Sequence, residues 1–195
     1  MVSVSVLIAG VDEVGRGALF GPVVAAAVIL PQGSTESLFP SGIRDSKRLS
    51  PGVRVRLATE IRALALGYKI GMASVQEIDR LNILQATLLA MKRSIFRLRP
   101  QPDLCLIDGN QAIPNLEIPQ KTLIKGDQHS IEIAAASIVA KVWRDTLIIR
   151  LARKYPEYDL INNKGYGTEK HRDALKQYGP SSQHRRSFRP CQMSN

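Results

Sequence analysis

The chain has 195 residues, of which 44% are hydrophobic, and it carries a formal net charge of +10. No apolar run approaches the ~20 residues that a membrane span needs. The two cysteines provide neither a disulfide framework nor the spacing of a zinc site. The N-terminal stretch MVSVSVLIAG is typical of a strand rather than a signal peptide. We therefore expect a cytoplasmic monomer with one domain over residues 1–195, in which residues 156–195 form an appendage.

The positive charge is concentrated toward the C-terminus. From residue 141 onward there are 12 Lys and Arg against 5 Asp and Glu, whereas residues 1–140 hold 15 against 12. Such an asymmetry is typical of a polyanion-binding surface, although a solvated basic face explains it equally well. The candidates for contacts with phosphates are Lys141, Arg144, Lys164, Lys170, Arg185 and Arg186.

Hydrophobic periodicity predicts that strands and helices alternate along the chain. In chain order, the predicted elements are strand 5–12, strand 22–30, helix 50–67, strand 68–75, helix 74–98, strand 103–109, strand 120–127, helix 130–155, and a glycine-rich loop with a final helix over 162–179. The alanines at 25–27 also permit a helix in the second element. The segment 180–195 is predicted to be polar and irregular. This order indicates an α/β fold.

Three of the predicted strands end in an acid beside a glycine or a glycine-rich turn. They supply Asp12 with Glu13, then Asp108, then Asp127. Functional groups gather at strand ends in open α/β sheets, so these acids are expected to share one crevice. Crowded carboxylates repel one another unless a cation neutralises them. Because the donors are all oxygens and the histidines lack ligand spacing, we predict Mg²⁺ or Mn²⁺ rather than Zn²⁺.

Adjacent acids on one strand raise a geometric question. Neighbouring side chains of a regular strand point to opposite faces. Asp12 and Glu13 are therefore expected to join one cluster only if the strand leaves its regular geometry at Glu13.

A dinucleotide-binding turn is a competing interpretation of the GRGALFG segment. Its third glycine lies one position too late for G-x-G-x-x-G, and the two carboxylates just before it would repel a pyrophosphate. An isolated Asp beside Gly is also common in ordinary turns. The sequence thus disfavours dinucleotide binding. The prediction of an acid cluster depends on the three strand ends taken together, and no single Asp–Gly pair would support it.

Longer segments support a family resemblance. GVDEVGRGALFGPVVAAAV resembles the N-terminal signature of the type 2 ribonucleases H. Other segments of that family follow in the same order: RDSKRLS, IDGN, KGD, AAASIVAKVWRD, NKGYGT and HRRSF. GRG, GYGT and the short N-terminus are more similar to ribonuclease HII than to ribonuclease HIII. The resemblance implies a ribonuclease H-like fold, with a mixed five-stranded sheet flanked by helices and a helical C-terminal part.

The resemblance also implies an activity. The enzyme would hydrolyse the RNA strand of RNA/DNA hybrids and cut on the 5′ side of ribonucleotides embedded in duplex DNA, leaving a 5′-phosphate and a 3′-hydroxyl. It would use two metal ions. The catalytic and metal-binding acids would be Asp12, Glu13, Asp108 and Asp127, of which Asp127 completes the cluster or acts through water.

Further residues are expected to bind the substrate. The resemblance assigns the recognition of a ribose 2′-hydroxyl to Gly15, Arg16 and Gly17, together with Tyr166. Ser46, Lys47 and Lys125 are candidates for phosphate contacts. Ser46 and Lys47 equally suit a cap of the segment that follows them, and Lys125 equally suits moderating the negative charge of the acid cluster. Ordinary alternatives are a solvated turn for Arg16 and a loop-closing role for Tyr166.

Two other function classes remain open from the sequence. A DNA-directed nuclease of resolvase or integrase type would need the acids but no sensor for a 2′-hydroxyl. A non-catalytic nucleic-acid-binding module would need the basic surface without the acids. A contact of the tail after Pro180 with a replication factor also remains open.

Overall fold

The computed structural model describes residues 6–34 and 49–192. Ser46 and Lys47 therefore lie outside the described residues. One five-stranded sheet has the order β3-β2-β1-β4-β5. β1 pairs antiparallel with β2 and parallel with β4; β2 pairs antiparallel with β3, and β4 parallel with β5. The strands are β1 (Ile8–Val14), β2 (Val23–Ile29), β3 (Gly67–Ala73), β4 (Leu104–Asp108) and β5 (Gln120–Leu123). The predicted mixed sheet is confirmed.

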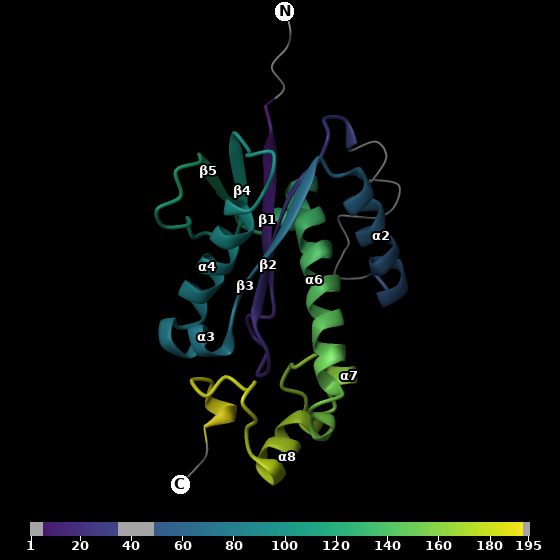
Figure 1. The fold of residues 1–195 in the computed structure, drawn as a ribbon, viewed down its shortest axis with the longest axis vertical. Coiled ribbons are helices and arrows are strands. Elements are labelled where there is room, and N and C mark those ends of the chain that lie inside the picture. The colour runs from purple at the N-terminus through teal and green to yellow at the C-terminus, as the bar shows by residue number, and fades with distance from the viewer. Residues whose placement is uncertain (1–5, 35–48, 193–195) are drawn as a thin grey trace, which may run out of the picture.

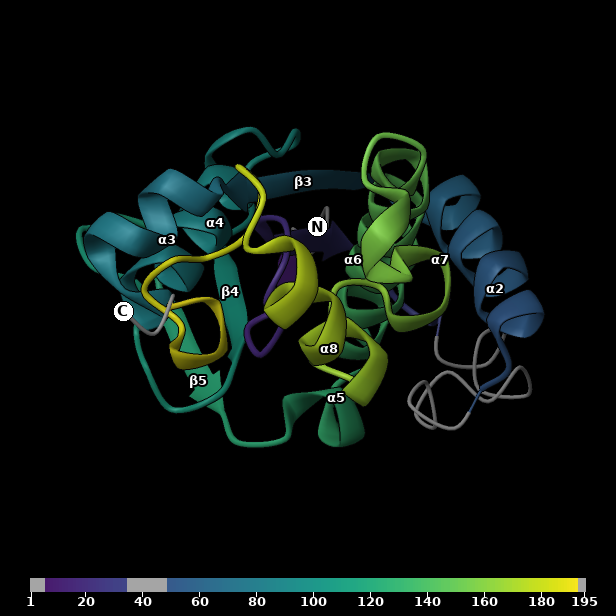
Figure 2. The ribbon, with the colours of Figure 1, turned by 90° about the horizontal axis from the view of Figure 1, so that it is seen from below.

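Helices cover both faces of this sheet (Figures 1 and 2). One apolar core lies between the sheet and α4, and a second lies between the sheet, α2 and α6. The helices are α2 (Pro51–Leu64), α3 (Val75–Leu81), α4 (Ile83–Phe96), α5 (Gly126–His129), α6 (Ile131–Ala152), α7 (Leu160–Asn163) and α8 (Glu169–Tyr178), with short 3₁₀ turns at Pro156–Tyr158 and Arg189–Cys191. No helix among the described residues has the length and apolarity needed to cross a membrane.

The predicted helix over 74–98 is two helices. Asn82, which separates α3 from α4, has a φ of 70°. Its side-chain oxygen accepts a hydrogen bond from the Gln85 N–H at 3.1 Å and so caps α4. Asparagine tolerates this left-handed conformation and is a good N-cap, so the chain restarts its helix there while the apolar spacing continues. Helix α2 also ends before Gly67, which begins β3.

The C-terminal segment packs against the turn between β1 and β2. Figure 1 shows α7, α8 and the last described residues at one end of the sheet, beneath that turn. A third apolar core joins Phe20 of the turn to Leu160 of α7, Leu175 of α8 and Cys191. Within residues 180–192, the expected irregular conformation is correct outside the Arg189–Cys191 turn, and His184, Arg185 and Cys191 are buried.

Candidate active site

Three carboxylates meet where β1 and β4 stop pairing. Asp12 and Glu13 lie near the end of β1, and Asp108 is the last residue of β4. The final pair of the β1/β4 ladder is Val11 with Ile107, so Asp12 and Asp108 come next on each strand. One carboxylate oxygen of each acid lies within 4.8 Å of those of the other two. The parallel strands therefore bring together acids that are almost 100 residues apart in the sequence.

Glu13 reaches this group from a regular strand. Its pairing with Ala25 fits the antiparallel register, which continues to Val14 opposite Val24. The expectation that the strand loses its regular geometry at Glu13 is therefore wrong. The ladder with β4 has already ended at this point, which leaves space beside β1, and the longer glutamate side chain places its oxygen near that of Asp12.

Burial and mutual repulsion dominate the electrostatics of the cluster. The pKa of Asp12 is raised well above its usual value by burial, and further by the charges of Glu13 and Asp108. A hydrogen bond with Ser137 opposes this rise. Burial also raises the pKa of Glu13, although Arg16, whose guanidinium lies 3.2 Å from its carboxylate, acts in the opposite direction. The protein thus concentrates negative charge where water stabilises it poorly.

Asp127 lies in α5 rather than at a strand end. β5 stops at Leu123, and Lys125 has a φ of 54° before α5 begins. The Gly126 N–H donates to Asp108 Oδ1 at 2.7 Å, which ties this helix to the carboxylate cluster. Asp127 is 3% exposed and is not among the three acids within 4.8 Å of one another. The exposed Lys125 is at the N-cap of α5.

The three acids line a cavity of about 430 Å³. The other lining residues come from the last position of β1, from the turn that follows it, from α2, from α6 and from the loop before α8: Val14, Gly15, Arg16, Gly17, Arg54, Ser137, Ile138, Lys141 and Tyr166. Carboxylates on one side therefore share a cavity with cationic, hydroxyl and aromatic groups on the other sides.

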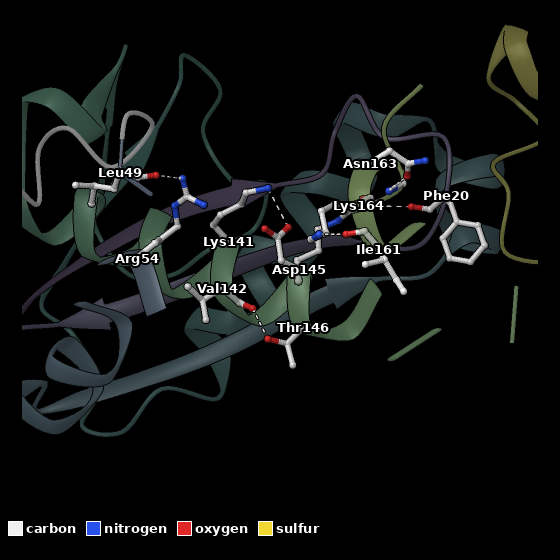
Figure 3. Close-up of polar contacts among 12 residues, drawn as sticks. Phe20, Leu49, Arg54, Lys141, Val142, Asp145, Thr146, Ile161, Asn163 and Lys164 are labelled. Atoms are coloured by element: carbon white, nitrogen blue, oxygen red, sulfur yellow. Dashed lines mark hydrogen bonds and ion pairs between the residues drawn. The ribbon is translucent and has the colours of Figure 1, made fainter. Parts of the chain in front are cut away.

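Arg54 and Ser137 are lining residues that the sequence analysis missed. Figure 3 shows Arg54 of α2 and Lys141 of α6 extending to the same side, with Arg54 bonded to the Leu49 carbonyl at 2.8 Å and Lys141 to Asp145 at 2.9 Å. A spacing of four residues places Ser137 and Lys141 on one face of α6, which is a signal in the sequence. No comparable signal points to Arg54.

The two glycines of the GRG turn differ in whether the protein's own packing requires a glycine at that position. Gly15 has a φ of +88°, and a Cβ there would lie 2.1 Å from Nε of Arg144. Gly17 is exposed, lies outside the left-handed region, and has no atom within 4 Å of a built Cβ. Nothing within the described chain thus requires glycine at position 17, although the cavity beside it does have room for a ligand.

Tyr166 is held beside the GRG turn by main-chain contacts. It forms an isolated β-bridge with Ala18, and the Leu19 N–H donates to the Gly165 carbonyl at 2.8 Å. The half-buried ring faces two cations, with Lys141 Nζ and Arg144 Cζ each 5.5 Å from its centroid. The structure therefore brings together the two predicted recognition segments.

A buried histidine pair supports the Tyr166 loop. Nδ1 of His171 lies 2.9 Å from the Tyr166 carbonyl, and its Nε2 lies 3.0 Å from Nε2 of His184. The Ser181 N–H donates to Nδ1 of His184 at 3.0 Å. These contacts assign one proton to each ring, on Nδ1 of His171 and on Nε2 of His184. Burial lowers the pKa of both, that of His184 to about 3.

This pair predicts a loss of stability in acid. Because the folded-state pKa of His184 lies below its unfolded value, the unfolded chain binds more protons below about pH 6.5. We expect its contribution to the free energy of unfolding to fall by about 1.4 kcal/mol per pH unit from there toward pH 3. Urea unfolding at pH 7, 6 and 5 measures this. His184→Gln should flatten the slope, whereas His129→Gln, at an exposed position, should not. Identical slopes for all three proteins would contradict the prediction.

Two of the predicted phosphate contacts are wrong. Arg144 and Arg185 are 0% exposed, and their guanidinium groups donate to main-chain carbonyls. They therefore belong to the interior, and charge counting along a sequence does not distinguish them from surface cations. Lys170 and Arg186 are exposed.

Comparisons with known proteins agree with this geometry. Residues 9–191 match the sequence model of the ribonuclease HII family. Ribonuclease HII of Acaryochloris marina is 65% identical over 187 residues, covering 96% of this chain and 94% of that protein. The ribonuclease H2 structure from Pyrococcus horikoshii OT3 has a TM-score of 0.79 at 28% identity, covering 95% of both chains. A complex of PCNA and ribonuclease HII from Archaeoglobus fulgidus gives 0.75 at 29%, covering 89% and 88%. The chain belongs to the ribonuclease HII family, whose members are ribonuclease H-type endonucleases.

Proposed function

We propose that this enzyme hydrolyses the RNA strand of RNA/DNA hybrids and cuts on the 5′ side of ribonucleotides embedded in duplex DNA. The observation that carries the proposal is the shared cavity, in which Asp12, Glu13 and Asp108 lie beside the exposed main chain of Gly17 and the ring of Tyr166. A phosphodiester and the adjoining sugar can be contacted together in such a site.

The three carboxylates suit hard divalent cations. Their donors are all oxygens, and the raised pKa of Asp12 indicates that the folded chain alone stabilises the negative charge poorly. We assign Asp12, Glu13 and Asp108 as ligands of Mg²⁺ or Mn²⁺, with Asp127 completing the cluster or acting through water. When bound, two such ions supply activation of a water molecule and stabilisation of the leaving 3′-oxygen. The products are a 5′-phosphate and a 3′-hydroxyl.

The GRG turn and Tyr166 are assigned to the ribose. Gly17 supports this role because no neighbouring atom of the described chain would clash with a Cβ at this position. Close approach of a sugar to the main chain is a sufficient reason for a glycine there. We assign Gly15, Arg16 and Gly17 to the 2′-hydroxyl and the Tyr166 ring to stacking near the following deoxyribose. This distinguishes the proposal from a DNA-directed nuclease, which needs no such sensor.

Cations around the cavity are assigned to the phosphates. Arg54 and Lys141 line the same cavity as the acids, and they come from helices on one face of the sheet. Ser46, Lys47 and Lys125 remain proposed phosphate contacts. Such contacts position a duplex without reading its sequence.

The wider setting is also proposed. We propose a cytoplasmic monomer with one domain, in which residues 156–195 help to hold the duplex. The buried free thiols of Cys105 and Cys191 support a reducing compartment. A contact between the tail after Pro180 and a replication factor is supported by the solved complex of a similar ribonuclease HII with PCNA.

Three duplexes of one sequence test the proposed activity. The purified protein is incubated with Mg²⁺ or Mn²⁺ and either an all-DNA duplex, the same duplex with one ribonucleotide, or an RNA/DNA hybrid. We expect cleavage of the second and third with a 3′-hydroxyl on the 5′ fragment, and no cleavage of the first. Cleavage of the all-DNA duplex would support a resolvase-type enzyme instead. Binding without any cleavage would support the binding module.

A further inference from the structure

Two arginines are buried beneath the turn that connects β1 to β2. Arg144 comes from α6 and Arg185 from the C-terminal tail, and both are 0% exposed. Neither forms an ion pair within 4.0 Å with another described residue. Burial lowers the pKa of both, that of Arg185 to about 9. A buried cation without a carboxylate partner is costly, so its other contacts must offset that cost.

The Arg185 guanidinium binds three carbonyls of the turn. Its Nη2 donates to the Gly15 carbonyl at 2.7 Å, its Nη1 to that of Arg16 at 2.8 Å, and its Nε to that of Gly21 at 3.0 Å. These bonds come from three separate nitrogen atoms held in one plane, a geometry that the single ammonium nitrogen of lysine does not reproduce. The two ends of the turn are thereby fixed by one side chain.

Arg144 binds the same turn from the side of α6. Its Nη2 donates to the Phe20 carbonyl at 2.9 Å and its Nε to that of Pro22 at 3.1 Å. Its Nη1 donates to the Lys164 carbonyl at 2.9 Å, next to the Tyr166 loop. Its side chain occupies the space where Gly15 would carry a Cβ. Arg144 therefore joins both recognition segments.

The orientation of these peptides decides what the turn can offer to a ligand. In a trans peptide, the carbonyl of one residue and the N–H of the next point in opposite directions. Since the Gly15 and Arg16 carbonyls point to Arg185, the N–H groups of Arg16 and Gly17 point away from it. Neither N–H has an acceptor among the described residues. Two main-chain donors are thus left available at the rim of the cavity.

We propose that Arg144 and Arg185 are positioning residues that hold the Arg16 and Gly17 N–H groups in the orientation that reads a ribose 2′-hydroxyl. This inference rests on the proposed function. Neither arginine touches the substrate. Arg185 acts directly on the two peptide planes that carry these N–H groups, whereas Arg144 acts by fixing the Phe20 and Pro22 end of the turn and by packing against Gly15. They set the discrimination between ribose and deoxyribose without contributing to the metal site.

Conservative variants test this role. Arg185→Lys and Arg144→Lys keep the charge but lose the planar fork, and Arg150→Lys is the matched control on the exposed face of α6. For Arg185→Lys we expect kcat/KM at a single ribonucleotide to fall on the order of 10²-fold, as for a small misplacement of reacting groups. The Kd for an all-DNA duplex and the Kd for Mn²⁺ should stay within about twofold, since phosphate and metal contacts remain.

The possible outcomes distinguish a failure of the positioning role from a failure of the proposed activity. A wild-type enzyme that cleaves all-DNA and ribonucleotide-containing duplexes equally would refute the proposed function. If the wild type is selective for the ribonucleotide and Arg185→Lys cleaves with an unchanged kcat/KM, the positioning role is overturned. Equal losses in cleavage, all-DNA binding and Mn²⁺ binding would also overturn it.

Amide NMR of the wild type gives a second measurement that needs no variant. With Ca²⁺ present, the Arg16 and Gly17 N–H signals should shift more with the ribonucleotide duplex than with all-DNA, and equal shifts would overturn the inference.

Discussion

Asp12→Asn and Asp108→Asn should each reduce metal-dependent cleavage by on the order of 10³-fold or more while leaving the fold intact. Each change removes one of the three charges that converge within 4.8 Å, and an amide oxygen is a weaker ligand for a hard cation than a carboxylate. Single-turnover cleavage of the single-ribonucleotide duplex in Mg²⁺ measures the loss. Circular dichroism shows whether the fold is retained.

The same Asp12→Asn change should stabilise the protein when metal is absent. Burial and the neighbouring acids raise the folded-state pKa of Asp12, so its carboxylate destabilises the fold increasingly as the pH rises through that value. Asparagine keeps an oxygen that can accept the Glu13 N–H, which donates to Asp12 at 2.7 Å, but carries no charge. We expect a gain of about 1–2 kcal/mol in the free energy of unfolding in EDTA at pH 8, decreasing toward pH 4.

Metal should reverse this order of stability. Mg²⁺ or Mn²⁺ binding stabilises the wild type by an amount that grows with the logarithm of the metal concentration once this exceeds the Kd, and the variant, which binds metal more weakly, should gain much less. Asp173→Asn, at an exposed acid of α8 paired with Lys176, is the matched control and should leave both cleavage and the metal effect unchanged. Near-normal cleavage by Asp12→Asn, or a lower stability than the wild type in EDTA at pH 8, would contradict the assignment of the cluster.

Tyr166→Ala should lower kcat/KM at an embedded ribonucleotide by about 10- to 100-fold, which corresponds to the loss of one stacking contact of about 1–3 kcal/mol. The loop should keep its place, because the bridge to Ala18 and the contact of its carbonyl with His171 involve main-chain atoms. Duplex affinity in Ca²⁺ should change by less than about threefold, since phosphate contacts dominate binding. Cleavage kinetics and fluorescence anisotropy on one duplex compare the two effects.

Tyr166→Phe is the matched control for this loop. It keeps the ring over which Lys141 and Arg144 lie, and it should retain most of the activity if stacking is the main contribution. Equal losses in cleavage and binding for Tyr166→Ala would argue against a role in recognising the sugar.

Much of the fold could be predicted because it follows from short-range patterns in the sequence. Apolar runs with β-branched residues indicated the five strands, and a Ser50 cap followed by proline indicated the start of α2. The acids at strand ends predicted the meeting of Asp12, Glu13 and Asp108, because parallel strands in one sheet bring their ends to one edge. These inferences need only the chain order and the period of the hydrophobic residues.

Features that depend on tertiary contacts could not be predicted in the same way. The break at Asn82 requires a left-handed residue that the continuing apolar spacing conceals. Arg144 and Arg185 look like surface cations in the sequence, and only the folded turn supplies the carbonyls that make their burial tolerable. Asp127 follows an apolar run, yet the chain turns at Lys125 before reaching it.

The contacts between the β1–β2 turn and the tail have a consequence for how the enzyme matures. The Gly21 N–H donates to the Gln183 carbonyl at 2.8 Å, and the Arg185 N–H donates to that of Leu19 at 2.9 Å. Ribosomes make Asp12 and Asp108 long before they make Arg185. A growing chain can therefore pair its catalytic strands while the turn still lacks its partners from the tail. Under the proposed function, selectivity for the sugar therefore depends on a part of the chain that is synthesised after the three acids.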